Sequence, residues 1–172
     1  ELSTDEITRA LCEAVASAQI FPVLCVSGGQ ALGVQPVLDA IVNLLPSPAA
    51  RAPVTGTNPK TQEEVECGPD PDAPFSALVF KTVDSPTGKL SLLSVVSGHV
   101  DSDSVVYNPT RDKKERVGQL FHLEGKKQHP VATALPGDII GVAKLKETHT
   151  GDTLCAEKNP VVLPPLVDFH PV

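Results

Sequence analysis

The chain has 172 residues, which is enough for one medium domain or for a small domain with an appended segment. Charged residues make up 20% of it and the formal net charge is −7, so the bulk charge excludes a strongly basic nucleic-acid binder. Hydrophobic residues make up 41%, which suffices for a packed core, and no apolar run approaches the roughly 20 residues of a membrane helix.

The first residues predict a helix followed by a strand. Ser3 and Glu6 have the spacing of a capping box, and apolar residues then recur with helical period from Ile7 to Ala18. The run 20–25 is apolar without alternation, which is typical of a strand buried on both faces.

A turn at 27–29 precedes a second predicted helix, which begins near Val34 and ends before Pro46 and Pro48. A strand buried on both faces needs hydrogen-bonded neighbours, and residues 1–48 offer only one strand. We therefore expect residues 1–48 to be the end of an α/β domain whose other strands lie upstream.

The next stretch reads as a connection between domains. Residues 46–74 contain seven prolines and two glycines. Because proline-rich segments favour extended backbone, we predict that residues 49–74 form a semi-rigid linker.

Residues 75–172 predict a β domain. Six stretches have the composition of short strands and are separated by turn residues: 75–83, 90–97, 104–107, 115–123, 131–134 and 139–145. This spacing indicates an antiparallel barrel or sandwich. Alternation predicts that Ile139, Gly141, Ala143 and Leu145 face the interior of a small barrel. The predicted fold class is mainly β: an antiparallel β-barrel preceded by an incomplete α/β segment of helix, strand and helix.

Several motifs, in order, resemble those of a known family: Phe-Pro-Val-Leu-Cys at 21–25, Gly-Val-Gln-Pro-Val-Leu-Asp-Ala-Ile-Val at 33–42, and Thr-Gly-Asp-Thr-Leu at 150–154. The whole chain resembles bacterial elongation factor G, the ribosomal translocase among the translational GTPases. The resemblance implies that residues 1–48 end the GTPase domain and that residues 75–172 are the second domain, a β-barrel of the translation-factor type.

The resemblance also implies a GTP-dependent cytoplasmic parent protein that works on the ribosome. This chain has no phosphate-binding G-x-x-x-x-G-K-[ST] motif, so we expect the Mg²⁺ site and GTP hydrolysis to depend on parts outside it. Alternatives are a paralogue that protects or recycles ribosomes, and a separate module that binds a protein or the aminoacyl end of tRNA. Neither DNA nor a membrane is an expected partner.

The first candidate site is the loop containing Cys25, Ser27 and Gly28. The resemblance implies that its backbone contacts the guanine base of GTP in the parent protein. Gly28 replaces the expected alanine, and Gly29 follows it. The alternative is a glycine-rich turn that binds no ligand.

The second candidate is a basic stripe. Residues 1–74 hold three basic and ten acidic residues, whereas residues 75–172 hold eleven of each, and residues 111–127 hold six basic and three acidic ones. The resemblance implies that the second domain docks on small-subunit ribosomal RNA. The predicted phosphate contacts are Arg111, Lys113, Lys114 and Arg116, with Lys126 and Lys127 nearby. The alternative is a solvated hairpin edge whose lysines prevent aggregation.

The remaining polar motifs predict structure more than chemistry. The stretch 148–153 predicts a turn in which Gly151 has positive φ and Asp152 binds nearby amides; a metal or phosphate loop is the alternative. Residues 99–103 read as a hairpin loop rather than a metal site. The four cysteines match no zinc spacing, so we expect reduced cytosolic thiols and no metal, and an enzyme using Cys and His is the least favoured alternative.

Overall fold

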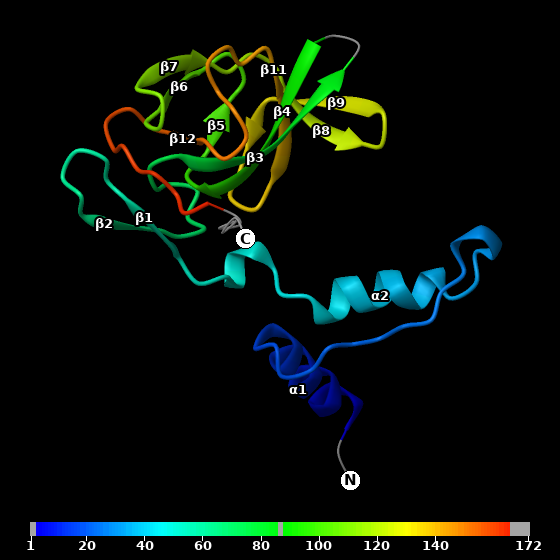
Figure 1. Ribbon diagram of the computed structural model, residues 1–172. Coiled ribbons are helices and arrows are strands. Elements are labelled where there is room, and N and C mark those ends of the chain that lie inside the picture. Colours follow the sequence, from blue (N-terminus) through cyan, green and yellow to red (C-terminus); the bar gives the residue numbers. More distant parts are fainter. Residues whose placement is uncertain (1–2, 86–87, 166–172) are drawn as a thin grey trace, which may run out of the picture. The chain divides into compact units, whose positions relative to one another are not determined.

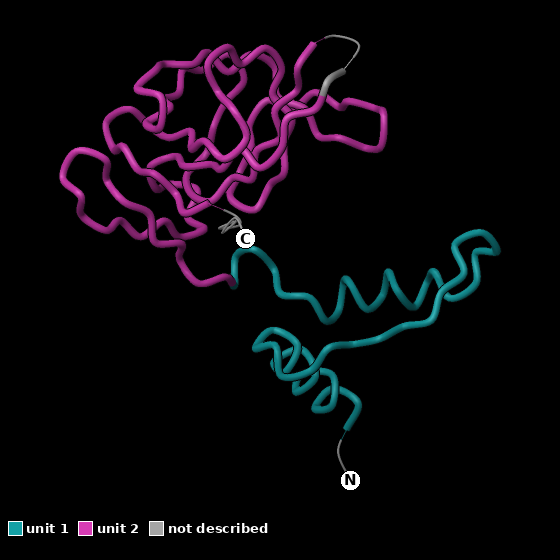
Figure 2. The backbone as a smooth tube through the Cα atoms, in the orientation of Figure 1, with its two compact units in different colours: residues 1–50 teal, residues 51–172 magenta. Residues whose placement is uncertain are grey.

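The computed structural model describes residues 3–85 and 88–165. The chain divides into two compact units, Glu1–Ala50 and Arg51–Val172 (Figure 2). Each unit is described by itself below.

The first unit contains two α-helices, α1 (Thr4–Ala16) and α2 (Val34–Leu44). The predicted capping box is confirmed: the Glu6 N–H donates to Ser3 Oγ at 3.3 Å, and the Ser3 N–H donates to Glu6 Oε2 at 2.8 Å. This exchange satisfies amides that the first helical turn leaves without partners. Both predicted helices are therefore present.

The predicted strand at 20–25 is wrong for this chain. Within the described residues this segment pairs with no other strand, and its side chains are exposed, with Phe21 at 76% and Val23 at 91%. A strand exists only where neighbours accept and donate its hydrogen bonds. After it, the 3₁₀ turn η1 (Gly28–Gln30) lies between Ser27 and Leu32, which form an isolated bridge.

The predicted linker is not extended throughout. After the 3₁₀ turn η2 (Pro48–Ala50), residues within 49–74 form an antiparallel hairpin of β1 (Val54–Thr57) and β2 (Glu64–Cys67). The linker prediction relied on the number of prolines and overlooked the short alternation of apolar residues, Val65 and Cys67, that is typical of a strand. The Cys67 side chain is buried in a cluster with Cys155, which holds the hairpin on the main sheet.

Among the described residues, eight strands form one antiparallel sheet, and a two-stranded sheet accompanies it (Figure 1). The order in the large sheet is β7 (Lys113–Arg116), β6 (Val105–Asn108), β12 (Thr153–Cys155), β3 (Ser76–Ser85), β4 (Gly88–Ser97), β11 (Ile139–Ala143), β8 (Leu120–Glu124) and β9 (Lys127–Val131). The small sheet pairs β5 (Val100–Asp101) with β10 (Thr133–Ala134). The prediction of a mainly antiparallel β fold is confirmed.

The strand predicted at 115–123 is two strands, β7 and β8. Between them the Val117 N–H still donates to Ser104 O at 2.9 Å and the Asp103 N–H to Gly118 O at 3.0 Å, in the register of the β6–β7 pair, and β8 begins only at Leu120, where the chain pairs with β11. Val117 is fully buried, and its hydrophobicity made the break invisible in the sequence pattern.

The predicted interior face is wrong for β11 itself, although Leu145, which follows the strand, is buried in the main core as predicted. Ile140 and Val142 are fully buried in the main core, whereas Ile139 is 60% exposed. Gly141 lies on the other face beneath Leu90, where an added Cβ would come within 3.3 Å of that side chain. The small residue therefore accommodates packing outside the core, and the alternation is shifted by one residue.

Candidate nucleic-acid interface

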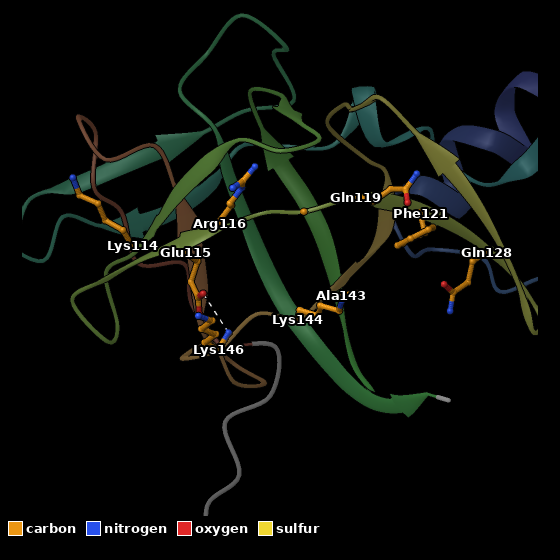
Figure 3. A pocket seen from close by; sticks show the side chains of 10 residues that line it. Lys114, Glu115, Arg116, Gln119, Phe121, Gln128, Ala143, Lys144 and Lys146 are labelled. Atoms are coloured by element: carbon orange, nitrogen blue, oxygen red, sulfur yellow. Dashed lines mark hydrogen bonds between the residues drawn. The ribbon is translucent and has the colours of Figure 1, made fainter. Parts of the chain in front are cut away.

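A hollow of about 700 Å³ opens between β7, the β8–β9 hairpin and the segment that follows β11 (Figure 3). We call it the basic groove. Its lining among the described residues comprises Lys114, Glu115, Arg116, Gly118, Gln119, Phe121, Gln128, Ala143, Lys144 and Lys146. The groove thus combines four cations with one carboxylate, two side-chain amides and a single aromatic ring. Such a lining suits phosphate oxygens better than stacked bases.

Only part of the predicted basic stripe lies in this groove. Lys114 and Arg116 line it, and they come from β7 at one end of the sheet. The flanking Lys126 and Lys127 belong to the β8–β9 hairpin at the other end of the strand order, and neither is among the described lining residues. Only part of the stripe therefore contributes side chains to the groove.

Arg111 and Lys113 also lie outside the described groove lining. Arg111 Nε donates to Asp152 Oδ2 at 3.1 Å, which ties the guanidinium to a buried carboxylate although 47% of the side chain remains exposed. Lys113 is exposed on β7. Binding of RNA by either residue stays a prediction.

Sequence reasoning missed Lys144 and Lys146. They follow β11, which pairs with β8, and that pairing brings them to the groove. Their immediate neighbours carry no motif, and the hydrogen bonds from the Lys146 and Glu147 amides to Glu115 place the segment beside β7. Lys144 has φ 65°, a left-handed conformation that costs a residue with a side chain about 1–2 kcal/mol.

The groove cations from β7 have only weak partners. Lys114 Nζ lies 2.8 Å from Glu157 Oε1, and Arg116 lies 3.5 Å from Asp103, with all four side chains more than half exposed. Exposed ion pairs of this kind contribute about 0–1 kcal/mol, so a phosphate could replace either carboxylate at little cost.

A buried carboxylate joins the two basic walls of the groove. Glu115, only 4% exposed, accepts hydrogen bonds from the backbone N–H of Lys146 at 3.2 Å and of Glu147 at 2.6 Å. Its Oε1 also accepts from Thr148 Oγ1 at 3.0 Å. Figure 3 shows Glu115 directed toward Lys146. β7 is thereby bound to the segment after β11.

A second buried carboxylate, Asp152, organises the predicted turn. Its Oδ2 accepts from His149 N–H at 2.9 Å, Asn108 Nδ2 at 3.0 Å and Arg111 Nε at 3.1 Å. Gly151 has φ 94°, so the predicted turn chemistry of 148–153 is confirmed. Burial alone would raise the pKa of Asp152, but these hydrogen bonds and the Arg111 charge lower it below its ordinary value.

The predicted guanine loop is a closed, exposed turn. Ser27 N–H donates to Leu32 O at 2.9 Å, and Leu32 N–H donates to Ser27 O at 3.1 Å. Gly33 completes the turn at φ 70°, where an added Cβ would lie 2.6 Å from Cys25 O. A Cβ on Gly28 would meet no atom within 4 Å, so main chain there is open to approach. Contact of Cys25, Ser27 or Gly28 with guanine stays a prediction.

Metal-ligating clusters and membrane-spanning helices are both absent from the described residues. Within them, no group of three His, Cys, Asp or Glu side chains is arranged to hold a metal ion. Neither described α-helix has the length and apolar character that crossing a membrane would require.

Comparison with known proteins now defines the class. Residues 74–157 match the family described as elongation factor G domain 2, so this part of the chain is a translation-factor domain. The chain is 40% identical over 172 residues to "Elongation factor G 2" of Syntrophus aciditrophicus (strain SB), and it covers 25% of that relative. A crystal structure of ttk003000868 from Thermus thermophilus is similar with a TM-score of 0.71 and 26% identity, over 98% of this chain and 23% of that one.

The chain belongs to the elongation factor G family, as its sequence motifs predicted. It spans about a quarter of the length of the relative that it matches.

Proposed function

We propose that the chain works within a GTP-dependent ribosomal translocase of the cytoplasm, and that its β domain docks on RNA of the small ribosomal subunit. Membership of the elongation factor G family supports the ribosomal role. The observation that carries the docking proposal is the basic groove, where four cations from two segments far apart in the sequence line one hollow. Phosphate contacts of this kind position a protein on RNA without reading its sequence.

We further propose that the sheet closes into a barrel. The groove is lined both by Lys114 of β7 and by Gln128 of β9, which belong to the two ends of the strand order. The curl of the sheet thus brings its end strands to the same hollow. A closed barrel is a rigid support on which cations from separate strands keep fixed distances.

The guanine contact belongs to the same proposal. In the longer protein, the loop that contains Cys25, Ser27 and Gly28 would lie against the base of GTP, while the phosphates and Mg²⁺ would be held by segments outside this chain. The Ser27 N–H and C=O already bond Leu32, so the main chain at Gly28 would make the approach. The open approach at Gly28 supports this role. A backbone contact of this type tolerates replacement of a small side chain by glycine.

Sedimentation with purified small ribosomal subunits tests the docking proposal. The variant Lys114→Ala/Lys146→Ala removes one cation from each wall of the groove, and its matched control Lys60→Ala/Lys81→Ala removes the same charge from exposed lysines outside the described lining. Two lost phosphate contacts should weaken binding at 100 mM salt roughly 10- to 100-fold.

The control variant should bind within about threefold of the unmodified chain, because distant exposed charges are screened. Equal weakening by both variants would mean that net charge alone drives binding, and the groove would lose its role. Stronger binding of charged tRNA than of small subunits would instead favour a module for the aminoacyl end of tRNA.

A further inference from the structure

One buried acid lies among the cations of the basic groove. Glu115 lies between Lys114 and Arg116 on β7, and successive side chains of a strand point to opposite faces. Lys114 and Arg116 are therefore exposed while Glu115 is buried at 4%. A negative charge there lowers the attraction of the groove for phosphate, so direct binding gives no reason for an acid at this position.

The hydrogen bonds of Glu115 supply a different reason. Its carboxyl group accepts from two successive backbone amides, those of Lys146 and Glu147, and from the hydroxyl of Thr148. All three donors belong to the segment that carries the groove cations Lys144 and Lys146. This segment has no regular secondary structure of its own between β11 and β12 to fix it in place.

The same segment begins in an unfavourable conformation. Lys144 has φ 65°, and its N–H donates to Lys89 O at 3.3 Å. A left-handed residue with a side chain persists only where surrounding contacts hold it. The bonds to Glu115, two to four residues further along, are contacts of this kind.

We infer that Glu115 is the positioning residue of the basic groove: it holds the segment that carries Lys144 and Lys146 against β7, so that its cations line the same hollow as Lys114 and Arg116. This role rests on the proposed docking function. Glu115 itself touches no phosphate, and its effect on binding acts through the segment that it orders. Two cations on a disordered segment would each lose conformational freedom on binding, which reduces their contribution.

Two substitutions of Glu115 test the inference at different strengths. Glu115→Ala removes all acceptors. Glu115→Gln keeps one acceptor oxygen. If that oxygen accepts from Glu147 and Thr148, only the hydrogen bond from the Lys146 N–H is lost, because the new NH₂ group of the glutamine faces that N–H. Val95→Ala is the matched control, since it destabilises the buried core without touching the groove.

The first readout is amide hydrogen exchange, which needs no RNA. Relative to Val95→Ala, the Glu115→Ala variant should exchange the amides of Lys146 and Glu147 at least roughly tenfold faster, and Glu115→Gln should affect mainly Lys146. Exchange that changes equally in the control would overturn the positioning role. This result stands whether or not the chain binds small subunits.

The second readout is the salt dependence of binding to small ribosomal subunits. Raising salt from 50 to 200 mM should weaken binding about 150-fold with four phosphate contacts and about 12-fold with two, taking a slope of about 0.9 per contact. The unmodified chain and Val95→Ala should show the larger loss, and Glu115→Ala the smaller one. An unchanged slope in Glu115→Ala would overturn the inference. No binding by the unmodified chain would instead refute the proposed docking function, and hydrogen exchange would then decide the positioning role alone.

Discussion

The turn at 148–153 depends on the charge of Asp152, and its removal gives a measurable pH effect. A single oxygen, Oδ2, accepts three hydrogen bonds, and the side chain is only 3% exposed. Asp152→Asn retains an acceptor of the same shape but removes the charge. Because hydrogen bonds to charged groups contribute about 1.5–3 kcal/mol and those to neutral groups about 1 kcal/mol, three weakened bonds predict a loss of about 2–4 kcal/mol at pH 7.

The pH dependence follows from the lowered pKa of Asp152. A carboxyl group whose folded pKa lies below its unfolded value of about 3.9 contributes stability above that pH and loses it as pH falls through the folded value. The difference in unfolding free energy between the unmodified chain and Asp152→Asn should therefore be constant from pH 5 to 7 and shrink below about pH 4.

Urea unfolding followed by fluorescence of an attached dye or by circular dichroism, at pH 7, 5 and 3.5, measures this difference. Asp138→Asn is a useful comparison, because Asp138 Oδ2 accepts from the Leu135 N–H at 2.8 Å in a half-buried turn without a cation partner among the described ion pairs. A difference for Asp152→Asn that is the same or larger at pH 3.5 would refute the reasoning.

Three further predictions concern backbone, thiols and nucleotide. Gly98→Ala should destabilise the β domain by about 2–4 kcal/mol in urea unfolding, because φ is 64° and the new Cβ would lie 2.5 Å from Ala73 O. The control Gly118→Ala, whose new Cβ would meet no atom within 4 Å, should change the free energy of unfolding by less than about 1 kcal/mol, and equal effects of the two substitutions would contradict this reasoning. Burial raises the pKa of the Cys155 thiol, so at pH 8 it should react with a disulfide reagent at least about 100-fold more slowly than exposed Cys25, whereas similar rates would show that the core opens readily. Calorimetry should detect no GTP binding to this chain tighter than about 1 mM, since it has no phosphate-binding motif, and micromolar affinity would contradict that division of roles.

The sequence predicted the local features that short-range chemistry determines. The capping box at Ser3 and the turn around Asp152 depend on side chains that bind backbone only a few residues away. Both could therefore be read from spacing alone. The family motifs are equally local, and they predicted the family correctly.

Features that depend on distant pairing were not predictable. The inward face of β11 differs from the predicted one by a single residue, because Gly141 accommodates Leu90 of another strand. The groove joins Lys114 to Lys146 through Glu115, and no spacing rule relates those positions. For the same reason the basic stripe at 111–127 appeared as one surface in the sequence although its members lie on separate parts of the sheet.

Directed hydroxyl-radical probing tests the central claim most directly. An iron chelate would be attached to Gln119→Cys inside the groove, or to Lys60→Cys outside the described lining, after Cys12 and Cys25 are replaced by serine. We predict strong cleavage of small-subunit ribosomal RNA from position 119 and weak cleavage from position 60, both suppressed by about 500 mM salt. Equal cleavage from both positions, or none from position 119 while the protein is bound, would contradict docking through the basic groove.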